Sequence, residues 1–136
     1  MSTLEKLKGA KTLTDLAVIL GYKPAALSYL LYHFPVDQKY KAFTLPKRDG
    51  SHRSILAPNP ALKRLQRHLA NALYLALAEI DSSGAPRRQI SHGFAKQLSI
   101  ITNAATHKRR RHVLNLDLKD FFPSINFGRV RGIFIK

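Results

Sequence analysis

Cysteine and long apolar runs are missing from this sequence of 136 residues. Without cysteine the chain can form no disulfide and no thiolate metal site. No apolar run approaches the roughly 20 residues that span a bilayer, and the segment from Met1 to Lys6 lacks the apolar stretch of a signal peptide. We therefore expect a protein of a reducing cytoplasm, with no membrane partner.

Acidic residues are also scarce. Asp and Glu number 8 against 23 Lys and Arg, which gives a formal net charge of +15. A strongly basic domain attracts nucleic acid because Lys and Arg contacts release the counterions condensed on phosphates. The alternatives are an acidic partner protein or a charge that serves solubility. Hydrophobic residues make up 45% of the chain, enough for one folded domain rather than a disordered basic tail.

Apolar periodicity predicts helices in the first third of the chain. One helix is expected over residues 13–20, with Thr14 or Asp15 as its cap and Gly21 as its end. A second helix is expected over residues 24–32, because a proline suits its first turn. The chain is therefore expected to begin with a helical segment.

The next residues predict a β-hairpin. Residues 40–45 and 53–56 suit strands, and Asp49-Gly50 between them signals a two-residue turn. The tip of this hairpin carries basic side chains: Lys47, Arg48, His52 and Arg53.

A long helix is predicted after the hairpin, with Asn59 as its cap and Pro60 at its first position. A shorter helix is expected over residues 97–107, and Asn126 can cap a last one. The apolar residues of the long helix form one continuous stripe: Leu62, Leu65, Leu69, Leu73, Leu77 and Ile80. Its first basic residues lie on the other side: Lys63, Arg64, Arg67 and His68.

The segment from Val113 to Ile125 carries the only acidic residues after position 81. A short apolar strand is predicted to end at Asp117, and Asp120 follows three residues later. Mg²⁺ takes one or two carboxylates together with substrate phosphates, which suits a strand-end aspartate. The alternative is an ion pair between Asp117 and the Arg109–Arg111 run.

Five short segments, in order along the chain, resemble the reverse transcriptases of bacterial retrons. Asp117-x-x-x-x-Phe122 resembles polymerase motif A. Residues 46–55 resemble the fingers hairpin, and residues 57–66 resemble the start of the fingers helix. Ser91-His92-Gly93-Phe94 resembles the segment before the palm, and Asn103-Ala104-Ala105-Thr106-His107 matches the NAxxH motif that marks retron enzymes.

The resemblance implies an α+β fold in three sections. N-terminal helices would occupy residues 1–38. The fingers, with a β-hairpin, a long helix and the NAxxH region, would occupy residues 39–111. Residues 112–136 would begin a right-hand polymerase palm with motif A and its first strand, so that the palm is incomplete within these residues.

The resemblance also implies roles for the motif A residues. Asp117 would coordinate two catalytic Mg²⁺ ions, with the backbone carbonyl of Leu118 near the same metal. Asp120 would lie beside the incoming nucleoside triphosphate. The Phe122 ring would act as a steric gate that crowds a ribose 2′-hydroxyl and favours deoxynucleotides. Without the resemblance, Phe122 would be interpreted as a core aromatic.

Other implied contacts come from the hairpin and the NAxxH region. Lys47 and Arg53 would bind the triphosphate, for which the planar fork of Arg is well suited. The residues that would contact structured RNA are Asn103, His107, Lys108, Arg109, Arg110 and Arg111. Alternatively, Asn103 and His107 hydrogen-bond each other, since they are four residues apart on a predicted helix.

The family reaction would be RNA-directed DNA synthesis in a bacterial cytoplasm. A noncoding RNA would serve as template and primer for msDNA, with dNTPs as substrates, an RNA/DNA hybrid as product, and antiviral defence with an effector as the purpose. The second aspartate pair of the palm, in a Tyr-x-Asp-Asp hairpin, is not in the sequence. We therefore expect the 136 residues alone to be inactive, either as a fragment or as part of a split enzyme completed by a second polypeptide.

Two other functions stay open. Ala17, Gly21 and Leu27 have helix-turn-helix spacing, which suits a DNA-binding regulator. Its second helix, however, offers mostly apolar surface rather than the Arg, Asn or Gln that read base edges. A non-catalytic RNA-binding module is the third possibility. Asp117→Asn would spare the DNA binding of a regulator but abolish the activity of a completed enzyme.

Overall fold

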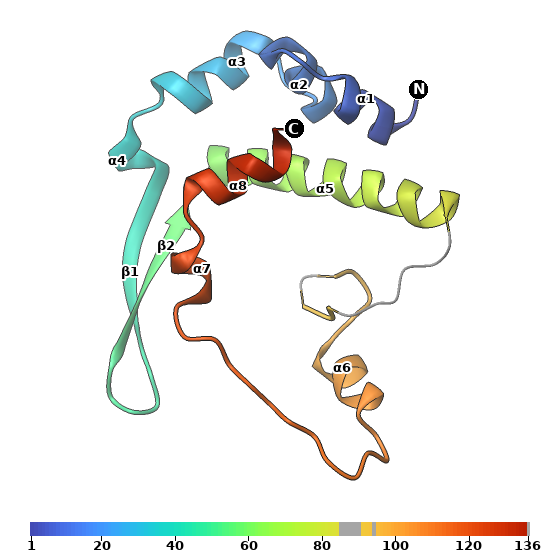
Figure 1. Ribbon diagram of the computed structural model, residues 1–136. Coiled ribbons are helices and arrows are strands. Elements are labelled where there is room, and N and C mark those ends of the chain that lie inside the picture. Colours follow the sequence, from blue (N-terminus) through green and yellow to red (C-terminus); the bar gives the residue numbers. More distant parts are fainter. Residues whose placement is uncertain (85–90, 94, 136) are drawn as a thin grey trace. The chain divides into compact units, whose positions relative to one another are not determined.

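The computed structural model describes residues 1–84, 91–93 and 95–135 (Figure 1). Its helices and one two-stranded antiparallel sheet confirm an α+β fold. The chain divides into two compact units, residues 1–88 and 89–136. The three sections implied by the family resemblance stay a prediction. Within the described ranges, no helix has the length and apolarity needed to cross a bilayer.

The long helix α5 (Pro60–Ser83) organises the first unit. As predicted, Asn59 caps it, with its side-chain oxygen accepting the N–H of Leu62 at 2.8 Å. Pro60 occupies the first position, where a missing N–H costs no helical hydrogen bond. The apolar stripe is buried only in part, since its second half stays about two-fifths exposed at Leu69, Leu73, Leu77 and Ile80.

Helix α1 (Thr3–Gly9) is not among the elements that the apolar periodicity predicts. Its first turn is held by Glu79 of α5, whose carboxylate accepts the N–H groups of Thr3 and Leu4 at 2.9 and 2.8 Å. These backbone hydrogen bonds, that from Leu4 first, lower the pKa of Glu79 because they favour its charged form. The carboxylate thus fixes the start of α1 on α5.

Helix α2 (Leu13–Leu20) is confirmed, but Thr12 caps it rather than Thr14 or Asp15. The Thr12 hydroxyl accepts the N–H of Asp15, and the Asp15 carboxylate accepts the N–H of Thr12. This reciprocal capping box begins one residue before the first apolar position. Gly21 ends the helix, as predicted, with a φ of +69° that only glycine adopts at little cost.

The predicted second helix is divided into two forms. Helix α3 (Pro24–Ser28) continues into a π-helical turn, η1 (Tyr29–His33). The N–H of Phe34 closes that turn by donating to the Tyr29 carbonyl at 2.7 Å. A short helix, α4 (Val36–Lys39), then leads into the sheet.

Helices α2, α3 and α5 meet in a small core. His68, which we expected on the basic side of α5, lies against α2 instead. Its Nδ1–H donates to the Leu20 carbonyl at 2.7 Å, and its ring meets Tyr22 edge-on. The buried residues of this core are Ala17, Leu20, Leu27, Leu65 and Ala72.

The predicted hairpin is confirmed, with longer strands and a different turn. Strand β1 (Tyr40–Pro46) pairs antiparallel with β2 (His52–Pro58), from Tyr40 opposite Pro58 to Pro46 opposite His52. The connection is residues 47–51 rather than Asp49-Gly50 alone. The N–H of Gly50 donates to the Lys47 carbonyl at 3.1 Å. Gly50 has a φ of +80°, which glycine adopts at little cost. Asp49 stabilises the turn by accepting the Ser51 hydroxyl and N–H.

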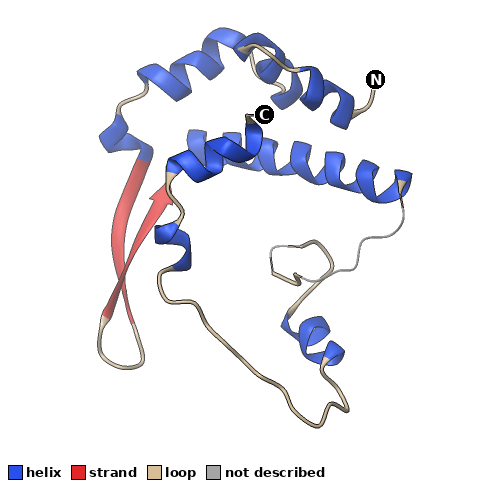
Figure 2. Cartoon of the chain, in the orientation of Figure 1, coloured by secondary structure: helices blue, strands red, loops and turns tan. Residues whose placement is uncertain are grey.

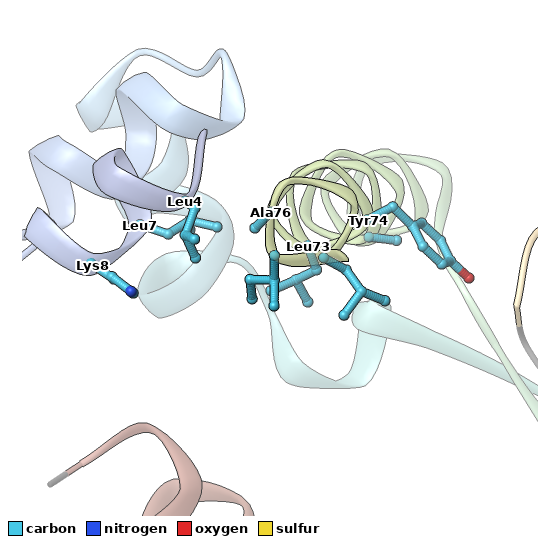
Figure 3. Close-up of a pocket in the computed structure, with 9 residues that line it drawn as sticks. Leu4, Leu7, Lys8, Leu73, Tyr74 and Ala76 are labelled. Atoms are coloured by element: carbon cyan, nitrogen blue, oxygen red, sulfur yellow. The ribbon is translucent and has the colours of Figure 1, made fainter. Parts of the chain in front are cut away.

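The exposed half of the α5 stripe faces α1 across an apolar groove (Figure 3). The groove has a volume of about 620 Å³. Leu4 and Leu7 line it from α1, and Leu73 and Ala76 line it from α5. The long helix therefore has an apolar stripe that this unit covers at one end only.

The described residues of the second unit form three short helices. Helix α6 (Ile100–Thr106) is shorter than the predicted residues 97–107, because Ser99 caps it and Gln97 has a φ of +64° that no α-helix allows. Helix α7 (Phe121–Ser124) is a single turn. Helix α8 (Phe127–Phe134) begins as predicted at Asn126, whose side chain accepts the N–H of Arg129.

The predicted palm strand is wrong for this structure. Residues 112–118 follow an irregular path (Figure 2). A strand needs a neighbour for its backbone hydrogen bonds, and in the described part of the chain the only sheet is β1 with β2. The apolar side chains of the segment are 58–80% exposed: Val113, Leu114, Leu116 and Leu118.

Candidate functional site

The motif A residues line one concavity of about 490 Å³ in the second unit. The chain turns at Asp120, which has a left-handed φ of +54°, a conformation that Asp tolerates better than most residues. The Asp120 carbonyl then accepts the N–H of Ser124 at 3.0 Å and starts α7. This turn brings together the side chains of the motif A segment. The lining residues are Leu116, Asp117, Leu118, Asp120, Phe121 and Phe122.

The carboxylates of Asp117 and Asp120 are exposed, and neither makes a hydrogen bond or ion pair with another described residue. The alternative ion pair between Asp117 and the Arg109–Arg111 run is therefore not formed in that part of the chain. Carboxylates of this kind, with the adjacent Leu118 carbonyl, are hard oxygen donors that fit Mg²⁺. Among the described residues no three His, Cys, Asp or Glu side chains gather, so other groups must complete such a site.

The two aromatic residues after Asp120 are not core residues in this unit. Phe121 is 47% exposed and Phe122 is 68% exposed. Their rings meet edge to face, with centroids 5.3 Å apart and planes at 72°. Phe122 keeps a large surface toward solvent. Its role as a steric gate stays a prediction.

Lys47 and Arg53 lie in the first unit, at the end of the hairpin. Lys47 is the first residue of the turn, where its N–H donates to the Ser51 carbonyl at 2.7 Å. Arg53 is on β2 opposite Leu45. Both side chains are exposed, and the register places them near the same tip. The hairpin thus carries two exposed cations near its tip. Their contact with a triphosphate stays a prediction.

Asn103 and His107 are both exposed on α6 or at its end. Asn103 is within the helix, and His107 is its C-terminal cap. The backbone N–H of Asn103 donates to the Ser99 carbonyl, and that of His107 donates to the Ala104 carbonyl. Neither side chain has a hydrogen-bond partner among the described residues. The alternative in which they bond each other is therefore wrong for this structure. Both side chains are available to a ligand.

The basic run after α6 is a turn rather than the lead-in to a strand. Lys108 donates its N–H to the Ala105 carbonyl, and Arg110 donates its N–H to the His107 carbonyl. Arg109 has a left-handed φ of +60°, and all four basic side chains from Lys108 to Arg111 are exposed. The turn therefore displays a cluster of cations directly after the NAxxH residues, as a phosphate-binding surface requires.

Two connections in the structure are missing from the sequence analysis. Glu79 holds α1, although Ser2-x-x-Glu5 is a readable capping-box signal for that helix. His92 contacts the Thr102 hydroxyl through Nδ1 at 2.9 Å. No local pattern signals the second contact, because its partners are ten residues apart.

Similar proteins were found among curated retron enzymes. Retron Mx65 reverse transcriptase of Myxococcus xanthus is 42% identical over 127 residues, which are 92% of this chain and 28% of that protein. Retron Mx162 reverse transcriptase of Myxococcus xanthus is 39% identical over 89% of this chain and 24% of its own length. Retron Ec86 reverse transcriptase of Escherichia coli is 32% identical over 90% of this chain and 36% of its own length.

The chain belongs to the retron reverse transcriptase family. The resemblance found in the motifs is thereby confirmed over most of the chain. No family model matches the chain, and no solved structure matches it. This retron-type chain spans about a quarter to a third of the length of the relatives just named.

Proposed function

We propose that this chain is part of an RNA-directed DNA polymerase that copies a structured noncoding RNA into msDNA. One observation carries the proposal. An exposed Asp117 carboxylate with no partner among the described residues shares a concavity with Phe122, in a chain 42% identical to a retron reverse transcriptase. A metal-binding acid beside an exposed ring is the arrangement that nucleotide addition with sugar selection needs.

The motif A residues have distinct roles in this proposal. Asp117 holds catalytic Mg²⁺ together with the Leu118 carbonyl. When bound, the metal supplies Lewis-acid stabilisation of the charge that develops on the phosphate. Asp120 presents its backbone N–H beside the triphosphate. The exposed Phe122 ring fills the space that a ribose 2′-hydroxyl would need.

The basic residues bind the polyanionic ligands. Lys47 and Arg53 neutralise the triphosphate of the incoming dNTP. Asn103 and His107 recognise the structured RNA, and the turn from Lys108 to Arg111 contacts its phosphates or those of the RNA/DNA hybrid. Support for this assignment comes from the exposure of all these side chains in the structure.

Ligands other than Asp117, Asp120 and the Leu118 carbonyl complete the metal site. Asp117 and Asp120 supply two carboxylates at most, whereas a two-metal site clamps both the attacking and the leaving oxygen. Further palm aspartates, carried by additional chain or by a second polypeptide, would supply the rest. The 136 residues alone are then inactive in the bacterial cytoplasm, and antiviral defence with an effector belongs to the completed protein.

A chimaera tests the proposed reaction. This chain would replace the matching region of the Mx65 relative, and extension of a primer with dNTPs, Mg²⁺ and an RNA template would be measured. We expect the chimaera to extend the primer and the isolated chain not to. Asp117→Asn should lower the chimaera's rate at least about a thousandfold, because several kcal/mol of metal-mediated stabilisation are lost.

Asp37 provides the matched control for this substitution. It is an exposed acid at the start of α4, in the first unit. Asp37→Asn removes the same charge and should leave the rate within about twofold. Equal rates for the two Asn variants would show that Asp117 does not hold the catalytic metal. Product from the isolated chain would show that no further palm aspartates are needed.

The steric gate is tested in the same chimaera with Phe122→Ala. Removing the ring opens the space for a 2′-hydroxyl, so the preference for dNTPs over rNTPs should fall by about tenfold or more. The comparison is between kcat/KM values for the two sugar types. Phe121→Ala, which removes the neighbouring ring, should leave the preference closer to the starting value. The opposite order of effects would assign the gate to Phe121.

A non-catalytic RNA-binding module is the second candidate. It is favoured by the exposed side chains of Asn103 and His107, which have no hydrogen-bond partner among the described residues. The isolated chain should then bind structured RNA more tightly than duplex DNA at matched salt. A DNA-binding regulator is less well supported. The exposed residues of α3 include Pro24, Ala25 and Ala26, whose side chains offer no hydrogen bonds to base edges.

A further inference from the structure

Helix α6 lacks the burial that usually holds a helix in place. It has seven residues and none of them is buried, with Ile100 and Ile101 at 88% and 75% exposure. Isolated helices shorter than about 12 residues are marginal in water. The orientation of Asn103 and His107 therefore depends on polar contacts rather than on core packing.

One such contact comes from outside the helix. His92 belongs to the Ser91-His92-Gly93 segment, and its Nδ1 lies 2.9 Å from the Thr102 hydroxyl oxygen. Both residues are half-buried, so water competes less for this hydrogen bond than for a fully exposed one. Thr102 immediately precedes Asn103 on α6.

The hydrogen bonds of Thr102 indicate which atom donates. Its hydroxyl oxygen accepts the N–H of Ser99 at 2.8 Å, as one half of the capping box of α6. Its own hydrogen is directed to the Ser99 carbonyl at 2.8 Å. One lone pair is left, and a hydroxyl has no second hydrogen to give. His92 must then donate from Nδ1, so its proton is on Nδ1 in the neutral ring.

We propose that His92 is a positioning residue for RNA recognition. Its Nδ1–H holds the Thr102 hydroxyl, fixes the first turn of α6, and thereby sets the direction in which Asn103 and His107 face the RNA. The role in RNA binding rests on the proposed function, whereas the hold on α6 does not. The Ser91-His92-Gly93 segment thus supports the NAxxH residues rather than serving only as a turn.

Two substitutions at His92 separate the donor atom from the shape of the ring. The side-chain nitrogen of Asn lies as many bonds from the backbone as Nδ1, and that of Gln corresponds to Nε2. His92→Gln in the 136-residue chain should make the Asn103 amide exchange about fivefold faster, as expected for loss of a hydrogen bond of typical net strength. His92→Asn should restore most of the protection. Nitrogen-detected NMR of the unchanged chain should show a proton on Nδ1.

A double-mutant cycle tests the partner. Thr102→Val removes the hydroxyl, and Thr102→Ser keeps it. His92→Gln should add no further exchange in the Thr102→Val background, but its full effect in the Thr102→Ser background. Additive effects in both backgrounds, or equal behaviour of His92→Asn and His92→Gln, would overturn the inference.

RNA binding is measured separately with the same variants. Asn103→Ala is the reference for direct contact, with a structured hairpin RNA as the probe. His92→Gln should weaken binding about fivefold, and His92→Asn should recover it. If Asn103→Ala leaves the affinity unchanged, the proposed RNA contact is wrong, and the exchange data still decide the role of His92. If only Asn103→Ala weakens binding, His92 does not position the site.

Discussion

The two units of this chain differ in where they keep their apolar side chains. In the first unit, helices α2, α3 and α5 bury Leu20, Leu27 and Leu65 in a common core. In the second unit none of the described residues is buried, and Leu116 and Phe122 are 77% and 68% exposed. The proposed catalytic aspartate lies in the second unit. The residues proposed for chemistry thus have the least internal support, while the supporting scaffold lies elsewhere.

This contrast explains the missing strand. Residues 112–118 have the apolar composition of a strand but neither a paired neighbour nor a covered face among the described residues. A lone strand gains no ladder hydrogen bonds. Exposed apolar surface of this kind favours aggregation or partner binding. If the proposed palm completes this region, its strands would supply both the pairing and the cover.

The largest predicted difference between the units is in core substitution. Leu27→Ala should lower the free energy of unfolding by about 2–5 kcal/mol, because it empties a fully buried site. Leu116→Ala removes the same atoms from an exposed site and should change the free energy by less than about 0.5 kcal/mol. Urea denaturation followed by circular dichroism gives both values. Similar losses at the two sites would contradict the contrast between the units.

A smaller difference is predicted for helix caps. Asn59 and Asn126 accept N–H groups at 2.8 and 3.0 Å in the same way, one at the start of α5 and the other at the start of α8. Asn59→Ala should cost about 1 kcal/mol of global stability because α5 belongs to the core. Asn126→Ala should fray α8 with little effect on the main transition. Thermal unfolding measures the first effect, and exchange of the Arg129 amide measures the second.

The smallest predicted effect is a pH response confined to α1. The pKa of Glu79 is lowered by the N–H groups of Leu4 and Thr3. Its contribution to the stability of α1 is therefore fully present above the ordinary pKa near 4.5. That contribution is lost as the pH falls through the lowered folded-state value. Amide exchange at Leu4, corrected for intrinsic rates, should therefore show less protection at pH 3 than at pH 7. Glu79→Gln should remove this pH dependence, whereas Asp37→Asn should keep it.

Much of the first unit can be predicted from local patterns. The cap at Asn59, the end of α2 at Gly21 and the pairing of residues 40–45 with residues 53–56 all follow from short-range chemistry. The predicted helix bounds are wrong where more than one nearby residue can cap the helix. Thr12 takes the cap because Asp15 is placed to complete the box, and Gln97 leaves the helix because Ser99 can cap it.

The candidate site was predictable in its residues but not in its surroundings. The spacing from Asp117 to Phe122 identifies motif A, and relatives at 32–42% identity confirm the family. No pattern of that kind indicates that both phenylalanines are exposed or that residues 112–118 are unpaired. Exposure depends on which other surfaces are present, and a periodicity in one segment carries no information about them.

The sequence by itself determined the family. Its charge of +15, its two isolated aspartates and its ordered motifs point to the retron reverse transcriptases, and the chemistry proposed above follows from that family. Only the tertiary structure decided that Glu79 holds α1, that His68 bonds the Leu20 carbonyl of α2 and that His92 bonds Thr102. The reason is physical: composition and spacing set which bonds a segment can make locally, but contacts between distant residues form only where the packed chain brings a donor to an acceptor.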